Sequence, residues 1–230
     1  MKELIEIEPL FESRTIKPTF DYVHVLLALF IFGENLDGIG RYRLEKELQI
    51  GSGTAKSLFR KLKDNIDFIT VPVEDKGRYT KSQRKGHVLT KNGHKFLNKI
   101  KKRIPLLERA DLVFLKDIII EAENVNPYFC LVKNAVKKIK DGIEQRDAAI
   151  KINGSGATCL IYDGTDLYFP TKVQSINERE KIQQKTLNYF KNKIKDANVT
   201  FEANDVIIIG SGKNPQTSRL ATLNAALTLF

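Results

Sequence analysis

The sequence predicts an α+β protein of two domains, residues 1–104 and 105–230. Apolar residues in the first part recur mostly at helical spacing, whereas the second part alternates short β-rich runs with amphipathic helices. A Lys/Arg cluster followed by Pro105 separates the two compositions. The chain's 230 residues are enough to bury a hydrophobic core in each domain.

The formal net charge of +10 is concentrated in one stretch of the chain. Residues 41–104 carry eighteen basic and six acidic side chains, a net charge of +12, whereas residues 1–40 carry −4 and residues 105–230 carry +2. A localised excess of positive charge favours a polyanionic partner, which is nucleic acid or, less often, an anionic membrane surface.

Nothing in the sequence predicts a membrane span, a signal peptide or a metal site. The longest apolar run, 22–32, is interrupted by His24 and is too short to cross a bilayer. Cys130 and Cys159 lie in apolar, strand-like stretches, so we expect buried free thiols and a reducing, cytoplasmic location. The three histidines have the spacing of neither a zinc site nor a catalytic triad, so we expect no metal and no cofactor.

Three helices are predicted before residue 66, and glycine-containing segments separate them. They begin at Thr19, Arg41 and Gly53. The segment 33–40, with three glycines, ends the first helix, and the second ends at Leu48. In the tight turn that follows, Ser52 is expected to be the N-cap of the third helix.

The third helix, 53–65, has one apolar and one basic face. Its apolar residues follow the spacing i, i+3, i+4 and i+7: Ala55, Leu58, Phe59 and Leu62. The opposite face carries Ser57, Arg60 and Lys61, with Lys56 and Lys63 at its edges. In a helix that enters the DNA major groove, Arg60 or Lys61 would reach guanine acceptors, and hydroxyl groups would bind phosphates or base edges. These hydroxyls belong to Ser52, Thr54 and Ser57.

A charged hairpin and a further helix follow. Residues 68–73 are β-branched and apolar enough for a strand, and 87–89 supply its partner. A hairpin tip rich in cations can lie along a phosphate backbone or enter the minor groove. Its cations are Lys76, Arg78, Lys81, Arg84 and Lys85. The segment 91–103 then reads as a closing helix with Phe96, Leu97 and Ile100 turned inward.

The run RLEKELQIGSGTAKSLFRKLKDN (43–65), followed by HVLTKNGHKFLNKI (87–100), resembles prokaryotic winged-helix regulators. The resemblance implies a winged helix-turn-helix over residues 1–104, in which the third helix reads the major groove and the wing touches the flanking backbone. Because winged helices are also used to bind proteins, a protein-interaction module with a solvated basic face is an alternative.

The C-terminal part predicts the order β-α-β-β-α-β-α, that is, a two-layer α/β sandwich with its helices on one face. The β-rich runs are 111–122 and 128–136, followed by a helix over 141–152, strands at 157–162 and 167–169 around an Asp163-Gly164 turn, a helix over 177–195, a strand at 205–210 and a helix over 215–229. Residues 129–170, with GIEQRDAAIKINGSGATCLIYDG, resemble the second domain of a small archaeal family that pairs a winged helix with an uncharacterised α/β domain. The resemblance covers nearly the whole chain.

Two groups of polar residues in this domain are candidate ligand sites. Asp141, Glu144, Arg146 and Asp147 cluster on one short helix, where they bind a polar effector or a metal, or simply cap and salt-bridge that helix. Ser211 and Lys213 lie in a Gly-Ser-Gly-Lys turn between a strand and a helix, which either cradles an anion or is a plain turn. The turn does not match a Walker A motif.

Together these patterns predict a sequence-specific DNA-binding transcription regulator, not an enzyme. We expect it to bind double-stranded DNA as a homodimer, with a C-terminal domain that oligomerises, senses a small-molecule effector, or does both. Because the segment 220–230 is strongly apolar, we expect residues 105–230 alone to self-associate. Two alternatives are an RNA-associated binding protein and an enzyme in the second domain that is tethered to a DNA-binding module.

Overall fold

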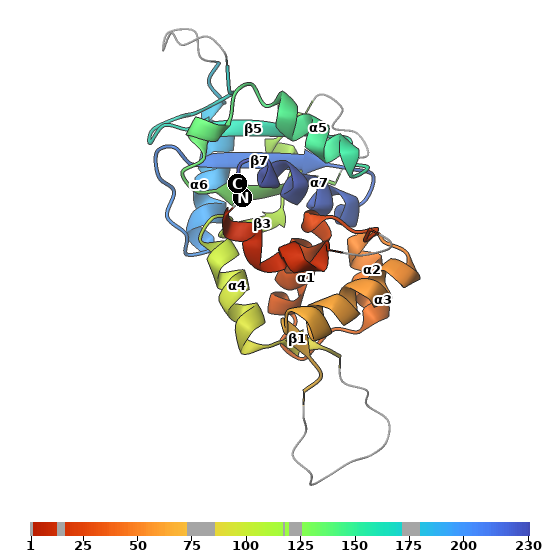
Figure 1. The fold of residues 1–230 in the computed structure, drawn as a ribbon. Coiled ribbons are helices and arrows are strands. Elements are labelled where there is room, and N and C mark those ends of the chain that lie inside the picture. The colour runs from red at the N-terminus through yellow and green to blue at the C-terminus, as the bar shows by residue number, and fades with distance from the viewer. Residues whose placement is uncertain (1, 13–16, 73–85, 117, 120–125, 172–179) are drawn as a thin grey trace. The chain divides into compact units, whose positions relative to one another are not determined.

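The computed structural model describes residues 2–12, 17–72, 86–116, 118–119, 126–171 and 180–230. The chain is a mixed α+β protein with two compact units, Met1–Lys99 and Ile100–Phe230 (Figure 1). The division falls a few residues before the predicted boundary at 104/105. We describe the N-terminal unit and the C-terminal unit separately. No helix in the described part of the chain is long and apolar enough to cross a membrane.

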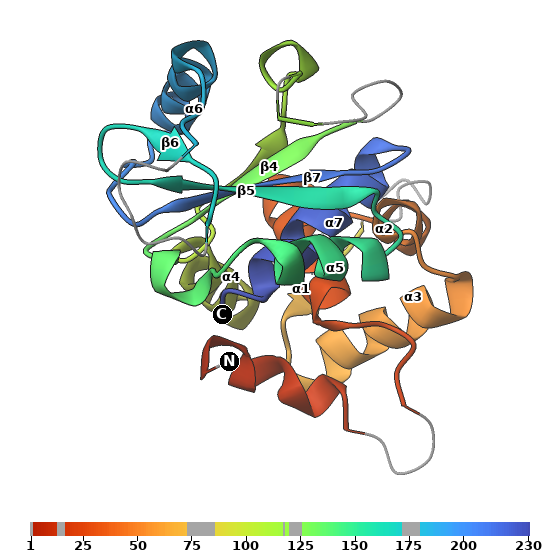
Figure 2. The same cartoon turned by 90° about the horizontal axis from the view of Figure 1, so that it is seen from above.

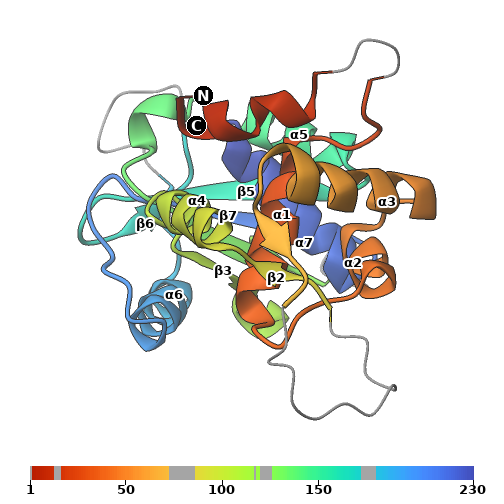
Figure 3. The same cartoon turned by 60° about the horizontal axis from the view of Figure 1, so that its bottom comes forward.

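The N-terminal unit is built around helix α1 (Tyr22–Glu34), which is apolar on nearly every side and buried along most of its length. Helices α2 and α3 lie on one side of α1 and α4 on the other (Figure 3). The remaining elements of this unit are η1 (Lys2–Leu10), α2 (Arg41–Leu48), α3 (Ser52–Arg60), the π-helical turn η2 (Lys61–Asn65), β1 (Ile69–Thr70), β2 (Val88–Leu89) and α4 (Lys91–Lys101).

The predicted helices of this unit are present, with differences at their ends. Helix α2 has the predicted bounds, and α1 begins at Tyr22 rather than Thr19. The prediction of Ser52 as an N-cap was wrong: Gly51 is the extended cap residue, its carbonyl accepts the Ala55 N–H, and Ser52 is already helical. The two strands are shorter than predicted and pair antiparallel, with Ile69 opposite Leu89.

The start of α4 explains why the sequence has Leu-Thr-x-x-Gly there. The Thr90 hydroxyl accepts the Gly93 N–H at 3.1 Å and donates to the Asp67 carbonyl at 2.6 Å, which ties the first turn of α4 to the strand region. A Cβ on Gly93 would lie 2.2 Å from the carbonyl oxygen of Phe68. Glycine is therefore needed for this close approach, which fixes α4 against the residues before β1.

We expect Gly93→Ala to lower the free energy of unfolding of the N-terminal unit by about 1–3 kcal/mol, because the methyl group displaces the Phe68 backbone. The matched control is Gly53→Ala, also in a helix of this unit, where a Cβ meets nothing within 4 Å. That control should leave the stability unchanged or raise it by up to about 1 kcal/mol, because alanine favours a helix. Thermal unfolding of the two full-length variants makes the comparison, and equal melting temperatures would contradict the steric argument.

The C-terminal unit contains a five-stranded antiparallel sheet in the order β3-β4-β7-β5-β6. Strand β7 is central and pairs through Ile208 with Cys130 on one side and Cys159 on the other. The elements are β3 (Leu106–Arg109), η3 (Leu112–Phe114), β4 (Tyr128–Val132), η4 (Val136–Lys138), α5 (Ile143–Lys151), β5 (Gly156–Tyr162), β6 (Leu167–Tyr168), α6 (Gln184–Asp196), β7 (Val206–Ser211) and α7 (Pro215–Leu227).

Helices cover both faces of this sheet, so the predicted two-layer sandwich with helices on one face was wrong (Figure 2). Alternate strand residues such as Phe129 and Ile207 pack with Phe190 of α6 in one hydrophobic cluster. On the opposite face, α7 approaches so closely that a Cβ on Gly210 would lie 2.4 Å from the Thr222 hydroxyl. Because helices cover the sheet on both faces, consecutive residues of its strands are buried. The continuous apolar runs in the sequence of these strands are typical of a sheet that is buried on both faces.

Among the other predictions for this unit, the hairpin and the buried cysteines are confirmed, and one strand is wrong. The Asp163-Gly164 hairpin between β5 and β6 is confirmed, with the Asp163 carboxylate accepting two backbone N–H groups of the turn. Both cysteines are buried and free, as predicted, and burial raises the pKa of the Cys159 thiol to about 12. The expected strand at 111–122 was wrong: in its described part Asp111 instead caps the short helix η3, because its carboxylate accepts the Val113 N–H.

The apolar C-terminal segment 220–230 belongs to the core of its own unit. Leu220, Leu223 and Leu229 are buried in α7 and just after it. These three leucines pack within their own unit, so they do not supply an exposed apolar surface, and the self-association of residues 105–230 stays a prediction.

Candidate nucleic-acid interface

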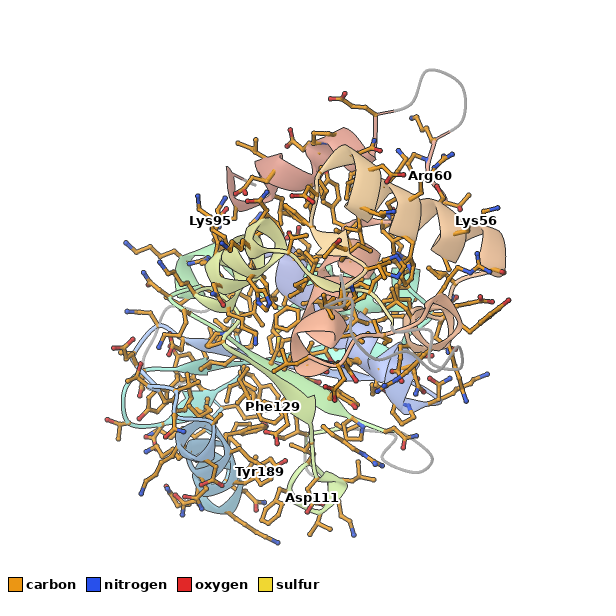
Figure 4. All side chains as sticks on the ribbon, turned by 90° about the horizontal axis from the view of Figure 1, so that it is seen from below. Lys56, Arg60, Lys95, Asp111, Phe129 and Tyr189 are labelled. Carbon is orange, nitrogen blue, oxygen red and sulfur yellow. The ribbon has the colours of Figure 1, made fainter. Side chains whose placement is uncertain are left out.

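The basic face of α3 is the candidate interface. Ala55, Leu58 and Phe59 are buried, and Leu62 continues the same stripe in η2, as predicted. The stripe fixes the rotation of the helix, so that basic side chains on the other face must point outward. Lys56 and Arg60, one turn apart, are exposed and project away from the unit (Figure 4).

A hollow of about 450 Å³ adjoins this face. It is lined by Gly53, Lys56, Ser57, Phe59, Arg60, Lys63, Asp64 and His87. Three cations and a hydroxyl group therefore surround one depression, in which oxygen atoms of an anionic ligand would find several donors. The structure thus brings Lys56, Ser57, Arg60 and Lys63 of the predicted set together.

His87 forms the strand side of the hollow. Its ring packs edge-on against Phe59, with the ring centroids 5.0 Å apart, and its backbone pairs with Ile39. Burial and the neighbouring charge of Lys63 lower the pKa of His87, so the imidazole is neutral at neutral pH. His87 thus lines the hollow as a neutral residue that is held by a backbone bridge and by packing against Phe59.

Two predicted contact residues of the third helix are engaged with the N-terminal segment instead. The Lys61 ammonium donates to the carbonyl oxygens of Leu10 and Glu12. The Thr54 hydroxyl is 2.6 Å from that of Thr19. The expectation that Lys61 points outward with Arg60 was therefore wrong, because carbonyl groups far away in sequence, which helical spacing does not reveal, bind its charge.

The remaining predicted contacts divide into exposed and undescribed residues. Ser52 is exposed at the first turn of α3. The hairpin cations Lys76, Arg78, Lys81, Arg84 and Lys85 lie outside the described residues. Sequence reasoning missed Asp64 and His87 in the hollow, because neither helical periodicity nor net charge shows that these two residues, 23 positions apart, line the same depression. Lys95 lies outside the apolar stripe of α4 and is exposed on the side of the unit away from Lys56 and Arg60 (Figure 4).

The charged cluster on α5 forms local contacts. The Asp141 carboxylate accepts the Ile143 N–H at 3.1 Å, in the manner of a helix cap. Arg146 pairs with its neighbour Asp147 at 2.9 Å, and both side chains are more than half exposed. Glu144 is exposed one turn along. These local contacts are those of the capping and salt-bridging alternative.

The turn that contains Ser211 and Lys213 is closed by its own residues. The Asn214 side chain caps α7 by accepting the Thr217 N–H at 2.8 Å. A Cβ on Gly212 would meet Thr217 at 3.0 Å, so little space is left in front of the helix. The Thr217 N–H in the first turn of α7 thus already has an acceptor, which favours the plain turn over the anion cradle.

A second hollow, of about 600 Å³, lies in the C-terminal unit. Its lining includes Glu108, Asp111, Tyr189 and Lys193, none of which sequence reasoning selected. The Asp111 N–H donates to the Tyr189 hydroxyl at 2.8 Å (Figure 4), and the Lys193 ammonium donates to Glu108 at 3.3 Å. Most of its polar groups therefore pair with one another rather than point together at a ligand.

Comparisons with known proteins concern the fold and the second half of the chain. Residues 124–229 match a family described as a domain of unknown function (DUF4443). The solved structure of a hypothetical protein from Pyrococcus horikoshii superposes with a TM-score of 0.63 at 21% identity, covering 91% of this chain and 93% of that chain. No curated protein matches. These findings fit the expected archaeal C-terminal domain, and the likeness at this identity is one of fold alone.

The contrast between Lys61 and Lys63 gives a testable distinction. We expect Lys61→Met to lower the stability of the N-terminal unit by about 1 kcal/mol or more, because two carbonyl groups lose a charged donor. Lys63→Met, the same substitution at an exposed position of η2, should change it by less than about 0.5 kcal/mol. Chemical denaturation of both variants measures the difference; equal midpoints would show that Lys61 does not anchor the N-terminal segment.

Proposed function

We propose that the protein is a sequence-specific DNA-binding transcription regulator whose N-terminal unit is a winged helix-turn-helix. In this proposal α2 and α3 are the helix-turn-helix, β1 and β2 are the base of the wing, and α3 enters the major groove. The C-terminal unit dimerises, binds a small-molecule effector, or does both. The order of the elements in the N-terminal unit supports this assignment.

One observation carries the proposal: the exposed Lys56 and Arg60 on α3 share a hollow with Ser57 and Lys63, opposite a fully packed apolar stripe. An α-helix fits the major groove of B-DNA, and an arginine side chain can pair with both acceptors of a guanine edge. The lysines would bind phosphates and fix the position of the helix along the groove. Asp64, an acceptor in the same hollow, suits an amino group of cytosine better than a phosphate.

Duplex DNA is favoured over duplex RNA for a geometric reason. The major groove of A-form RNA is deep and narrow, so a helix such as α3 cannot reach its base edges. A selection of tight-binding sequences from random DNA duplexes, followed by competition with duplex RNA and single strands, tests the choice. Preferential binding to RNA would overturn the regulator proposal in favour of an RNA-associated protein.

We expect Arg60→Ala to weaken binding to a selected DNA site by about 1–3 kcal/mol and to flatten the preference for that site over random duplex. The matched control is Arg43→Ala, the same substitution at an exposed position of α2 in the same unit. It should keep the preference, whatever it does to total affinity, because only α3 is placed against the bases. Fluorescence anisotropy titrations measure both ratios, and circular dichroism checks the fold.

The hairpin cations should behave differently from Arg60. We expect neutralising Lys81 and Arg84 together to weaken selected and random DNA about equally, because phosphate contacts carry no sequence information. The slope of log affinity against log salt should become shallower by roughly two. Full-strength, equally salt-dependent binding after removal of both Arg60 and these two charges would refute DNA reading by this unit and favour a protein partner.

A further inference from the structure

Helix α5 of the C-terminal unit has an outward face that nothing in the described part of the chain covers. Its inward face is anchored: Gln145 and Ala149 are buried, and the Gln145 amide donates to the Thr228 hydroxyl at 2.6 Å. The helix lies along β5 and α7 at the margin of the unit (Figure 2). On the other side, Ile143 and Ile150 are 46% and 50% exposed.

These two isoleucines belong to one stripe of the helix. Ile143, Arg146, Asp147 and Ile150 follow the spacing i, i+3, i+4 and i+7, which places them on the same face. Arg146 and Asp147, in the middle of the stripe, have side chains 55% and 60% exposed. Isolated exposed apolar residues are common on protein surfaces. Here two of them lie on the same helix face, one on either side of a pair of opposite charges, so the four side chains form one small patch.

The stripe is self-complementary. If a second copy of α5 is laid antiparallel across a twofold axis between positions 146 and 147, Ile143 of each copy faces Ile150 of the other. In the same arrangement Arg146 of each copy, which pairs with Asp147 of its own chain at 2.9 Å, also faces Asp147 of the other copy, so that the four central charges alternate in sign. The basic end of each helix, at Lys151, lies beside the first turn of the other, near Glu144. Antiparallel helix dipoles favour this arrangement as well.

We propose that the protein forms a twofold-symmetric homodimer through the outward face of α5, defined by Ile143, Arg146, Asp147 and Ile150. The occupant is a second copy of this chain because the apolar and charged positions match each other under a twofold axis, as an isologous contact requires. The inference names the surface for the dimerisation included in the proposed function. A helix of this length buries little area, so the free dimer is weak.

The central charges permit a test that does not rely on a loss of function. In Arg146→Asp, acidic residues face one another across the axis, and in Asp147→Arg, basic residues do. We expect each variant alone to dimerise at least tenfold more weakly than the wild-type chain, as measured by sedimentation equilibrium of full-length protein without DNA. An equimolar mixture of the two should recover dimer at the wild-type level, because acidic and basic faces then meet.

The apolar positions supply a second, independent arm. Ile150→Arg should weaken the dimer at least tenfold, whereas Val113→Arg, at a similarly exposed apolar position of the same unit, should not. Circular dichroism and melting temperatures check that all variants are folded. A wild-type chain that stays monomeric up to millimolar concentration, or charge variants that do not recover dimer on mixing, would overturn the proposal. Because no nucleic acid is present, failure here is distinguishable from failure of DNA binding.

Discussion

The packing of the apolar stripe of α3 is the constraint on which the candidate interface depends. Leu58 and Leu62 are completely buried, and Phe59 contacts both Phe32 of α1 and His87, the residue before β2. Rotation of α3 by one residue would expose these side chains and bury cations, at a cost of several kcal/mol. The basic face is therefore held outward by the core behind it. Because the stripe continues into η2, the same packing places Lys63 beside the hollow.

The C-terminal unit depends on a buried carboxylate in a comparable way. Asp205 is 1% exposed, and it accepts hydrogen bonds from the Lys133 ammonium and from the backbone N–H groups of Asn134 and Glu202. Burial alone would lower the pKa of Lys133, but hydrogen bonds to Asp205 and Glu202 outweigh it and raise the pKa. Asp205 thereby joins the end of β4 to the start of β7, and the central strand of the sheet is fixed at that point.

The sequence was sufficient wherever local periodicity decides the structure. It predicted the bounds of α2, the inward stripe of α3 and the hairpin between β5 and β6, because each depends on neighbours within a few residues. It failed where distant groups decide. The carbonyl partners of Lys61 are about fifty residues away along the chain. Similarly, α6 and α7 cover opposite faces of the sheet, which the residue pattern of neither helix reveals by itself. Likewise, the apolar residues after Asp111 favour a strand, but the cap at Asp111 starts a helical turn.

The proposed DNA binding and the proposed dimerisation through α5 would strengthen each other, because two chains bound to one duplex are at a high effective concentration. If the N-terminal unit is a DNA-reading winged helix, as proposed, it makes few base contacts, and a single unit would distinguish its site from random DNA only modestly. Two half-sites on one duplex hold two chains together at an effective concentration far above that in solution, so even a weak contact through α5 then becomes saturated. Each copy in turn adds its own base discrimination, so specificity is roughly multiplied rather than added. A small α5 interface is therefore sufficient to join two chains on one duplex. Binding of both chains to the same DNA already restricts their relative motion, so their association there costs less entropy than the association of two free chains.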